Sequence, residues 1–525
     1  MINSRTLYLG LILTSSLLLP ACGGGSNSSN TPNAVEQGSE EPTTEEPTPE
    51  PDTQAPTISQ VFPSNNHGMH SKQVLVSGQA KDNNALTSVV ITYGDESIIA
   101  ELNGHMFSAI INANPGKNNY SILATDEANN VTSVNETFYF GARASAGGAH
   151  TGVIKNDRIY AWGRNNKGQA GIGSITSIND DSEIATSHPI VPTLISAPST
   201  SAEDATETKF VSLAFNQNAS TALDINGNVW SWGDGDDGQL GLGIADDDII
   251  DETDHTSPQK IAALANIVAI SRGNDHCLLL KADGTVLAFG DNKYGQLGDG
   301  SNEDQDSPVT VNGLSNIVQI SASIGSYALD EEGRLWAWGS NKYGQLANGM
   351  KDSESHNIPT QIAIDEPVVS IASGKGHTLA LTRKGQVYAW GLNYSSQVGM
   401  RTSETWEKYI LSPKLLPWFD DVIAVWAKGN QSFAQRSDGK IYPWGQNMLG
   451  TLGLEQDGDV EQPSSPIFGL ENVADLGNGA LHTVAIRNDG KAFSWGWSFE
   501  GSLGGGESTI HRWAYRLPML LSLPE

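Results

Sequence analysis

The segment TVLAFGDNKYGQLGDG, residues 285–300, decides the fold of this chain, because a close variant, RLWAWGSNKYGQLANG, follows at residues 334–349. Each segment joins a short apolar strand to an aromatic-Gly step and a loop rich in glycine. The step occurs seven times, roughly 50 to 70 residues apart: Trp162-Gly163, Trp232-Gly233, Phe289-Gly290, Trp338-Gly339, Trp390-Gly391, Trp444-Gly445 and Trp495-Gly496. A unit of this size with several short strands cannot bury its apolar faces alone. The sequence therefore predicts an all-β fold in which seven repeats close into a seven-bladed β-propeller.

Further repeated positions place four strands in each repeat. The turn before the third strand carries glycine in six repeats, as hairpins with positive φ require, and Asp157 in the first. The loop after the aromatic-Gly step has its first glycine in six repeats and Ser396 in the other. Pro443 precedes the aromatic residue of the sixth repeat. Because proline has no backbone N–H, we expect it at a strand position where no neighbouring strand would accept a hydrogen bond. A proline is expected to introduce each fourth strand: Pro192, Pro258, Pro308, Pro359, Pro413, Pro466 and Pro518.

Together these positions resemble the regulator of chromosome condensation repeat, a family of seven-bladed propellers, over roughly residues 138–521. The resemblance implies the fold, but this scaffold hosts unrelated binding roles and so implies little about the ligand. Phe138–Phe140 and Leu517–Leu520 are expected to be strands at the two ends of the propeller. Two closures stay open: pairing of the last strand with the first repeat, or seven self-contained sheets.

The first residues indicate a targeting segment. Residues 1–22 combine the positive charge of Arg5 with an apolar run that is short for a membrane span. Leu19-Pro20-Ala21-Cys22 resembles the bacterial lipoprotein cleavage box, which implies that Cys22 becomes the lipidated first residue. The alternative is an ordinary secretory signal. No acidic residue directly follows Cys22, and by resemblance to Gram-negative lipoproteins this favours the outer membrane of the cell envelope, facing either the periplasm or the outside.

Two further segments precede the repeats. Residues 23–55 contain no Lys or Arg and almost no large apolar side chain, which predicts a disordered stalk. Residues 56–140 alternate short apolar strands with Gly, Asn and Asp turns, which predicts a small β-sandwich. This segment resembles the immunoglobulin-like domains of bacterial surface proteins. Asp82, Asp126 and Glu127 fall in loops where related sandwiches sometimes bind calcium, although solvated turn carboxylates are the favoured interpretation. The propeller is assigned to residues 141–525.

Charge and cysteine content narrow the function. The chain has 60 acidic residues against 30 Lys plus Arg, a formal charge of −30. Such a polyanion is repelled by phosphate backbones, which disfavours nucleic-acid binding, whereas a basic partner would be attracted. Two cysteines, Cys22 and Cys277, provide no disulfide framework. Cys277 replaces a strand threonine and is predicted to be a packed thiol.

No pattern of catalytic residues emerges. Seven equivalent positions, named here the His/Ser positions, are His150, Ser220, His276, Ser326, His377, Ser432 and His482. Four histidines around an axis suggest a metal site, but the favoured interpretation is that these side chains cap a turn or bond the backbone of a neighbouring repeat. Asp234 to Leu240 looks like a calcium loop and is interpreted as the second repeat's glycine loop. No enzyme activity, cofactor or metal is predicted.

The remaining signal lies where the repetition breaks. Insertions lengthen three connections, and loops on a rigid propeller commonly carry recognition. The candidate partner-binding residues are Asp246, Asp247, Asp248, Asp251, Glu252, Asp254 and Trp406. The predicted function is a membrane-anchored extracytoplasmic protein whose propeller binds a protein partner through loops on one face, with membrane contact through the lipid anchor alone. The acidic charge favours a basic partner. The alternatives are guanine-nucleotide exchange, as in the eukaryotic family, and carbohydrate or cell-wall binding.

Overall fold

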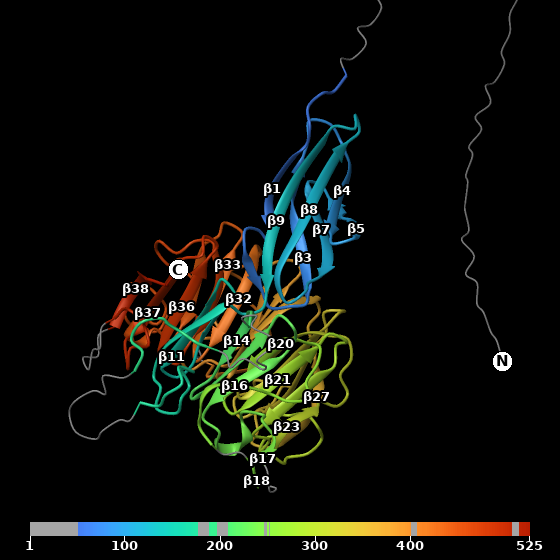
Figure 1. The fold of residues 1–525 in the computed structure, drawn as a ribbon. Helices are drawn as coiled ribbons and strands as arrows, with labels where there is room; N and C mark the ends of the chain where they lie inside the picture. The colour runs from blue at the N-terminus through green and yellow to red at the C-terminus, as the bar shows by residue number, and fades with distance from the viewer. Residues whose placement is uncertain are drawn as a thin grey trace, which may run out of the picture. The chain divides into compact units, whose positions relative to one another are not determined.

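The computed structural model describes residues 51–176, 188–196, 208–245, 249–250, 253–400, 407–506 and 514–524. The predicted signal peptide and all but the last residues of the predicted stalk lie outside these ranges. The described chain is all-β, as predicted, with two short 3₁₀ turns, η1 (Asp236–Gly238) and η2 (Met448–Gly450) (Figure 1). No helix in these ranges has the length and apolar character needed to cross a membrane. Asp52–Glu525 form one compact unit.

Two sheets come first in the chain. One has the order β1 (Thr57–Phe62), β3 (Gln73–Lys81), β7 (Met106–Asn112) and β6 (Glu101–Asn103). The other has the order β2 (His67–Met69), β9 (Val131–Phe140), β8 (Gly116–Asp126), β4 (Leu86–Tyr93) and β5 (Glu96–Ile99). Buried and exposed residues alternate along β3 and β8, as expected of strands with one face on a core. Val76, Ile91, Phe107 and Ile122 belong to that core.

The expected assignment of Phe138–Phe140 to a strand of the propeller is wrong, whereas the first repeat strand does begin after residue 141. Phe138–Phe140 do not begin a repeat, because they form the end of β9, where they pair with β2 and β8. Their alternating apolar pattern is the same for either sheet, so pattern alone did not distinguish the two. The first repeat begins after them, at Ala144.

Seven sheets follow in the described residues, each built from consecutive repeat strands; they are named repeat sheets 1 to 7 in chain order. Their strands are β10 (Ala144–Ala146), β11 (His150–Lys155), β12 (Arg158–Gly163) and β13 (Thr193–Leu194); β14 (Phe210–Phe215), β15 (Ala219–Asp224), β16 (Val229–Gly233) and β19 (His255–Lys260); β20 (Ile267–Arg272), β21 (His276–Lys281), β22 (Val286–Gly290) and β23 (Gln305–Thr310); β24 (Ile317–Ala322), β25 (Gly325–Asp330), β26 (Leu335–Ser340) and β27 (Ser355–Ile362); β28 (Val368–Ser373), β29 (His377–Thr382), β30 (Val387–Leu392) and β31 (Tyr409–Leu415); β32 (Val422–Lys428), β33 (Gln431–Arg436) and β34 (Ile441–Gly445); and β35 (Val473–Asn478), β36 (His482–Arg487), β37 (Ala492–Trp497) and β38 (Ala514–Leu520). A small hairpin, β17 (Ile244–Ala245) and β18 (Ile249–Ile250), is inserted in the second repeat.

Backbone geometry confirms several local predictions. The six hairpin glycines have φ between 74° and 83°, and Asp157 takes the same left-handed region at 62°. Ser396 likewise has φ of 62° where the other loops have glycine. Pro443 lies in β34, the outer strand of repeat sheet 6, which has three strands where the others have four. A fourth strand would have to use the N–H that Pro443 lacks.

The prediction that proline introduces the fourth strands is correct only for Pro192. Five of the other prolines lie inside the fourth strand, beside a shift in its register: Pro258, Pro308, Pro359, Pro413 and Pro518. Pro466 lies outside any strand. The outer strand is an edge, and a bulge lets an edge strand contain a residue without an N–H.

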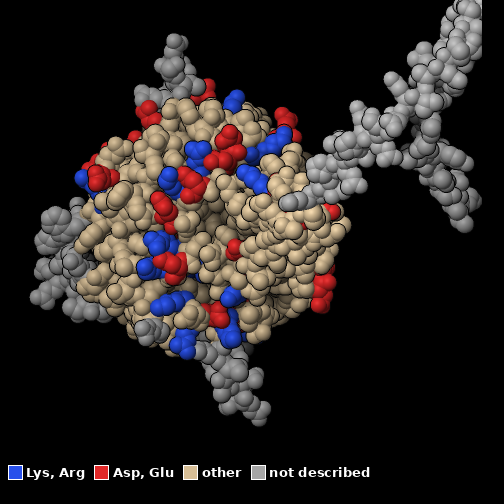
Figure 2. Space-filling model, turned by 90° about the horizontal axis from the view of Figure 1, so that it is seen from above, with Lys and Arg blue, Asp and Glu red and all other residues tan. Residues whose placement is uncertain are grey.

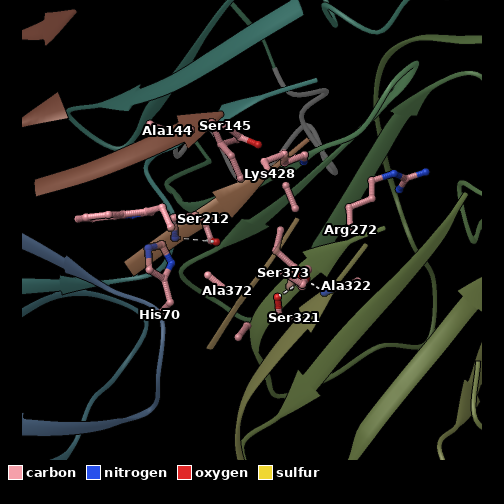
Figure 3. A pocket seen from close by; sticks show the side chains of 18 of the residues that line it. His70, Ala144, Ser145, Ser212, Arg272, Ser321, Ala322, Ala372, Ser373 and Lys428 are labelled. Carbon is pink, nitrogen blue, oxygen red and sulfur yellow. Dashed lines mark hydrogen bonds between the residues drawn. The ribbon is translucent and has the colours of Figure 1, made fainter. Parts of the chain in front are cut away.

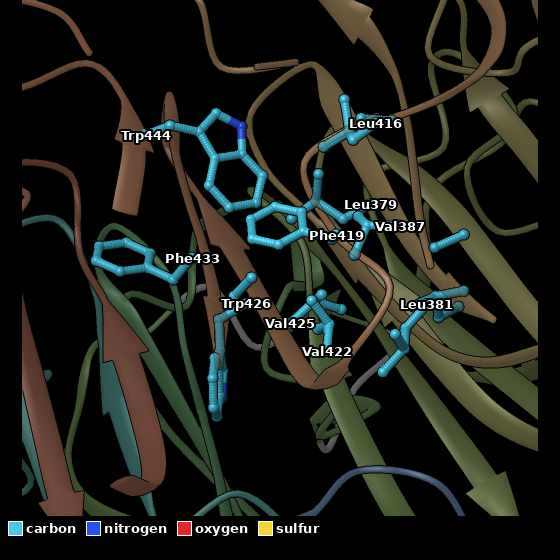
Figure 4. Packing of buried hydrophobic residues seen from close by; sticks show 14 of the residues in the cluster. Leu379, Leu381, Val387, Leu416, Phe419, Val422, Val425, Trp426, Phe433 and Trp444 are labelled. Carbon is cyan, nitrogen blue, oxygen red and sulfur yellow. The ribbon is translucent and has the colours of Figure 1, made fainter. Parts of the chain in front are cut away.

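The aromatic-Gly steps join neighbouring repeat sheets. Six tryptophans are fully buried, and each indole N–H donates to a backbone carbonyl of the preceding sheet's glycine loop, with N–O distances of 2.8 to 3.0 Å. The pairs are Trp162 to Ser502, Trp232 to Gln169, Trp338 to Gln296, Trp390 to Gln345, Trp444 to Gln397 and Trp495 to Thr451. Trp162 thus bonds the first sheet to the last. Apolar side chains such as Phe419 and Phe433 fill the space beside Trp444 (Figure 4).

Repeat sheet 3 bonds to its preceding sheet through a different side chain. Its aromatic residue is Phe289, which has no N–H to offer. The carbonyl of Gln239 instead accepts a hydrogen bond from Nη2 of Arg272 at 2.6 Å, and Nη1 of Arg272 donates to Thr221 at 2.7 Å. A buried arginine therefore takes the place of the indole at this junction.

Candidate binding site at the central cavity

The first strands of all seven repeat sheets line two adjoining cavities. The inner cavity, of about 170 Å³, is lined by parts of β10, β14, β20, β24, β28, β32 and β35 (Figure 3). The outer cavity, of about 320 Å³, is lined by the turns that follow these strands, including Gly147, Gly273, Gly374 and Gly479. Both cavities share Arg272, Ala322, Ser373 and Lys428. Pockets of this size suit small molecules or single side chains of a partner.

Strand register places two faces at the ends of this cavity. The hairpin turns between second and third strands lie together at one end, here named the hairpin face. The turns from first to second strands and the connections from third to fourth strands lie at the other end, here named the loop face. The outer cavity is at the loop face, because its glycines belong to the first-to-second turns.

The N-terminal sheets contact the hairpin face. Backbone N–H of Lys72 donates to the carbonyl of Val318 at 2.8 Å, and Nζ of Lys72 donates to the carbonyl of Ala282 at 2.6 Å. Nδ2 of Asn66 donates to the carbonyl of Asn488 at 3.3 Å. His70 also lines the inner cavity. Residues 66–72 therefore cover this end of the cavity in part.

Asp475 is the buried charge at this contact. Its carboxylate is fully buried, and Oδ2 accepts the backbone N–H groups of Arg143 at 2.5 Å and Ala144 at 3.0 Å. Oδ1 lies 3.2 Å from Nε2 of His70. Burial opposes ionisation, but His70, these N–H groups and the Arg143 charge outweigh it, so the pKa of Asp475 is lowered. Burial likewise opposes the charged form of His70, but Asp475 outweighs it and raises the pKa of His70.

The four histidines of the His/Ser positions bond neighbouring sheets, which confirms their structural interpretation. Nε2 of His150, His276 and His377 lies 2.8 to 3.0 Å from the serine hydroxyl at the next position along the chain, Ser220, Ser326 and Ser432 respectively. Nε2 of His482 lies 2.7 Å from Oγ1 of Thr151 in repeat sheet 1. The partner is a side-chain hydroxyl rather than backbone.

Burial controls the charge of these rings. It lowers the pKa of His150, His276 and His377 to about 3 and that of His482 to about 4. The preceding turns hold glycine because a Cβ would collide with the ring: a Cβ on Gly273 would lie 2.3 Å from Cε1 of His276 and 2.4 Å from the carbonyl oxygen of Ser323. The histidines are therefore neutral, tightly packed parts of the scaffold.

The acidic loop of the second repeat surrounds a lysine of the first. Nζ of Lys167 lies 3.3 Å from carboxylate oxygens of Asp234, Asp236 and Asp254. These carboxylates offset the cost of burial and raise the pKa of Lys167. Asp254, a predicted partner-binding residue, thus pairs within the chain. Asp246, Asp247, Asp248, Asp251, Glu252, Trp406 and the predicted lipid-attachment residue Cys22 lie outside the described residues.

Two other sequence predictions can be located. Asp82 and Asp126 lie together with Asp52, which the sequence did not single out, and Asp52 accepts hydrogen bonds from Asn83 and Asn84. Cys277 is fully buried, and burial raises the pKa of its thiol to about 11. This confirms that Cys277 is a packed thiol.

Comparison with known proteins identifies the repeat. Residues 226–280, 283–326 and 332–381 match the regulator of chromosome condensation (RCC1) repeat, and a second model of this repeat matches residues 267–296, 317–345 and 368–397. Residues 226–397 of this all-β chain therefore carry RCC1 repeats.

Among individual relatives, the ultraviolet-B receptor UVR8 of Arabidopsis thaliana is 29% identical over 69% of this chain and 78% of its own length. The human E3 ubiquitin-protein ligase HERC2 is also 29% identical over 69% of this chain, but the match spans 7% of the ligase. The structure of yeast RCC1 (Prp20) bound to Kap60 has a TM-score of 0.58, with 22% identity, and covers 73% of this chain and 85% of that chain. It shares the fold.

Proposed function

We propose that this chain is an anchored, extracytoplasmic binding protein: a seven-bladed propeller, preceded by an immunoglobulin-like sandwich, that recognises a protein partner through its loop face. The observation that carries the choice of face is the contact of residues 66–72 with the hairpin face. A partner would meet the N-terminal sheets there, whereas the longest connections between strands start at the loop face.

Closure of the seven sheets into a propeller is supported by two bonds between the first and last sheets. The indole of Trp162 donates to the carbonyl of Ser502 at 2.8 Å, and Oγ1 of Thr151 lies 2.7 Å from Nε2 of His482. Every sheet consists of strands of its own repeat. This supports closure by seven self-contained blades rather than by exchange of a terminal strand.

A complex of a relative supports a protein partner, and the distribution of charge supports the loop face. The yeast relative is bound to a second protein, Kap60. Seen from above, the side of the molecule that carries the N-terminal sheets has acidic and basic side chains interspersed (Figure 2), so it offers no single-sign surface for steering. The acidic insertion of residues 246–252 belongs to a loop-face connection, and its charge would steer a basic partner.

The experiment is a pull-down from the envelope fraction with the full chain as bait. Substituting Asp246, Asp247 and Asp248 together by Asn is expected to reduce capture of the partner severalfold at about 50 mM salt, and about 500 mM salt should release it from the wild type. The matched control carries Asn at Asp283, Asp438 and Asp489 on the hairpin face and should capture as the wild type does. Equal capture by both variants, or capture insensitive to salt, would contradict recognition by the loop face.

Anchoring is tested separately. The full chain should fractionate with membranes and incorporate a labelled fatty acid, and Cys22→Ser should abolish both, because the thiol is the site of lipid attachment. The matched control is Cys277→Ser. A Cys22→Ser chain that still carries lipid would disprove the anchor without affecting the pull-down.

A further inference from the structure

One equivalent position of the seven repeats, named here the cavity column, lies on the cavity wall and varies in residue type and charge. The residue four positions before each His/Ser position lines the inner or outer cavity. These residues are Ala146, Asn216, Arg272, Ala322, Ser373, Lys428 and Asn478. Five are small or neutral, and two, Arg272 and Lys428, are cations. Among the described residues that line the two cavities there is no Asp or Glu, although the chain has twice as many acidic as basic residues.

Arg272 lines the cavity, but its guanidinium group points away from it and adds positive electrostatic potential from a distance. Its side chain is 3% exposed and extends away from the cavity to Thr221 and Gln239 (Figure 3). Both partners are neutral oxygens, and its Nε has no hydrogen-bond partner. Burial lowers the pKa of Arg272 even though Asp275 and Asp234 act on it in the opposite direction. The guanidinium charge is therefore only partly offset.

Lys428 brings its charge into the cavity itself. It is half-buried, and Nζ donates to the carbonyl of Phe215 at 2.6 Å, so the side chain reaches from repeat sheet 6 to repeat sheet 2. No carboxylate lies within ion-pair distance of this ammonium among the described residues. Burial, together with the charge of Arg272, lowers the pKa of Lys428 to about 8. A single carbonyl uses one of the three N–H donors of an ammonium.

Two uncharged hydrogen-bond donors that lack a partner also line the cavities. Nδ2 of Asn478 and Oγ of Ser323 have no hydrogen-bond partner, and their residues are 4% and 8% exposed. Asn478 lines the inner cavity, and Ser323 lines the outer cavity together with Lys375. An amide N–H₂ and a hydroxyl can both donate to an acceptor-only group such as a carboxylate. The wall is thus rich in donors and cations.

We propose that the central cavity is a binding site for a small oxyanion, a carboxylate or phosphate group, held by the ammonium of Lys428. Removing a cation even partly from water is costly unless an opposite charge meets it, and the cavity wall supplies no carboxylate for Lys428. The combined size of the two cavities admits a small organic anion entering from the loop face. The argument for this site does not depend on the proposed protein partner, although a protein bound on the loop face would cover the entrance of the outer cavity.

The test is isothermal titration calorimetry of the full chain with inorganic phosphate and with succinate, which separate the two oxyanion sources, and with the uncharged succinamide. At least one anion should bind, and succinamide should not. Lys428→Met, which keeps an unbranched side chain one atom shorter, should weaken binding about tenfold or more, since it removes a charge-assisted hydrogen bond. Lys428→Arg should retain part of it. The control Lys384→Met, at a side chain 63% exposed, should bind as the wild type does.

A second measurement needs no variant. Acetylation of Lys428 by an amine-reactive ester, followed by mass spectrometry, should slow when the bound anion is present, whereas acetylation of Lys384 should not. The proposal is overturned if neither anion gives a saturable heat of binding, released or absorbed, up to about 10 mM. It is also overturned if a folded Lys428→Met protein binds as tightly as the wild type, or if the anion leaves acetylation of Lys428 unchanged.

Discussion

Acidification from pH 6.5 to about 4 is expected to destabilise this protein steeply, because its scaffold holds neutral histidines. Burial lowers the pKa of His67, His150, His276 and His377 to about 3 and that of His482 to about 4, against 6.5 in the unfolded chain. Between these values the unfolded chain binds protons that the folded chain cannot bind. The free energy of unfolding therefore falls as the pH falls, by about 1.4 kcal/mol per pH unit for each histidine.

The size of this effect approaches the whole free energy of unfolding of a typical domain. Five such histidines acting together over one to two pH units rival the whole stability of a typical domain, about 5–15 kcal/mol. His70 acts in the opposite direction, because its pKa is raised in the folded state, and its contribution is present below pH 6.5 and lost as the pH rises. One histidine cannot offset five.

Urea unfolding followed by tryptophan fluorescence at pH 7, 6, 5 and 4.5 measures the effect. The midpoint should fall throughout this series. His276→Asn should reduce the slope by one histidine's share, about 1.4 kcal/mol per pH unit, whereas the same change at the exposed His105 should leave the slope unchanged. A midpoint that stays constant from pH 7 to 5 would show that the buried rings are not neutral.

Asp475→Leu is expected to cost about 3–5 kcal/mol of unfolding free energy, as loss of one partner from a buried charged network does. The substitution leaves two backbone N–H groups, of Arg143 and Ala144, without an acceptor, and leaves His70 without its opposite charge. Because these groups join the hairpin face to the N-terminal sheets, the loss affects both the first repeat and that contact.

The urea midpoint at pH 7 measures this loss, and a matched change provides the reference. Asp457→Leu removes a carboxylate whose side chain is 54% exposed and paired with Arg516, and should cost less than about 1 kcal/mol. If the two variants unfold at the same urea concentration, the buried network around Asp475 does not contribute the expected stability. Combining His70→Ala with Asp475→Leu should cost less than the two single losses added together, because the two side chains share one interaction.

Much of the repeat architecture is predictable because it depends on local chemistry. Glycine tolerates the positive φ of a hairpin turn, and proline lacks the N–H that a neighbouring strand would accept, so both positions are predictable from backbone chemistry. The structure confirms this for Gly284 and Pro443. The histidines of the His/Ser positions were also interpretable, because His and Ser alternate at one position and can both bond a neighbour. These features need only the order of residues within a repeat.

Features that join distant segments were not predictable in the same way. His70 and Asp475 lie far apart in sequence, and neither belongs to a repeated pattern that links them. Asp254 was assigned to partner binding because its neighbours are acidic, yet Lys167 of the preceding repeat pairs with it. The cations of the cavity did leave a signal: Arg272 and Lys428 occupy a column otherwise filled by small or neutral residues. Comparing that column across repeats would have found them.

The alternation of histidine and serine at the His/Ser positions fits an even number of repeat sheets and not an odd number. Each of the first three histidines bonds the serine of the next sheet, so the sheets are used in pairs. Seven is odd, and the last histidine, His482, has no serine ahead of it; it turns to Thr151 instead. Strict alternation cannot continue through an odd number of sheets whose last bonds to the first without one mismatch, and that mismatch falls between repeat sheet 7 and repeat sheet 1. Repeats could be added or removed two at a time without disturbing the pattern, whereas a change of one would either erase this irregular junction or create another.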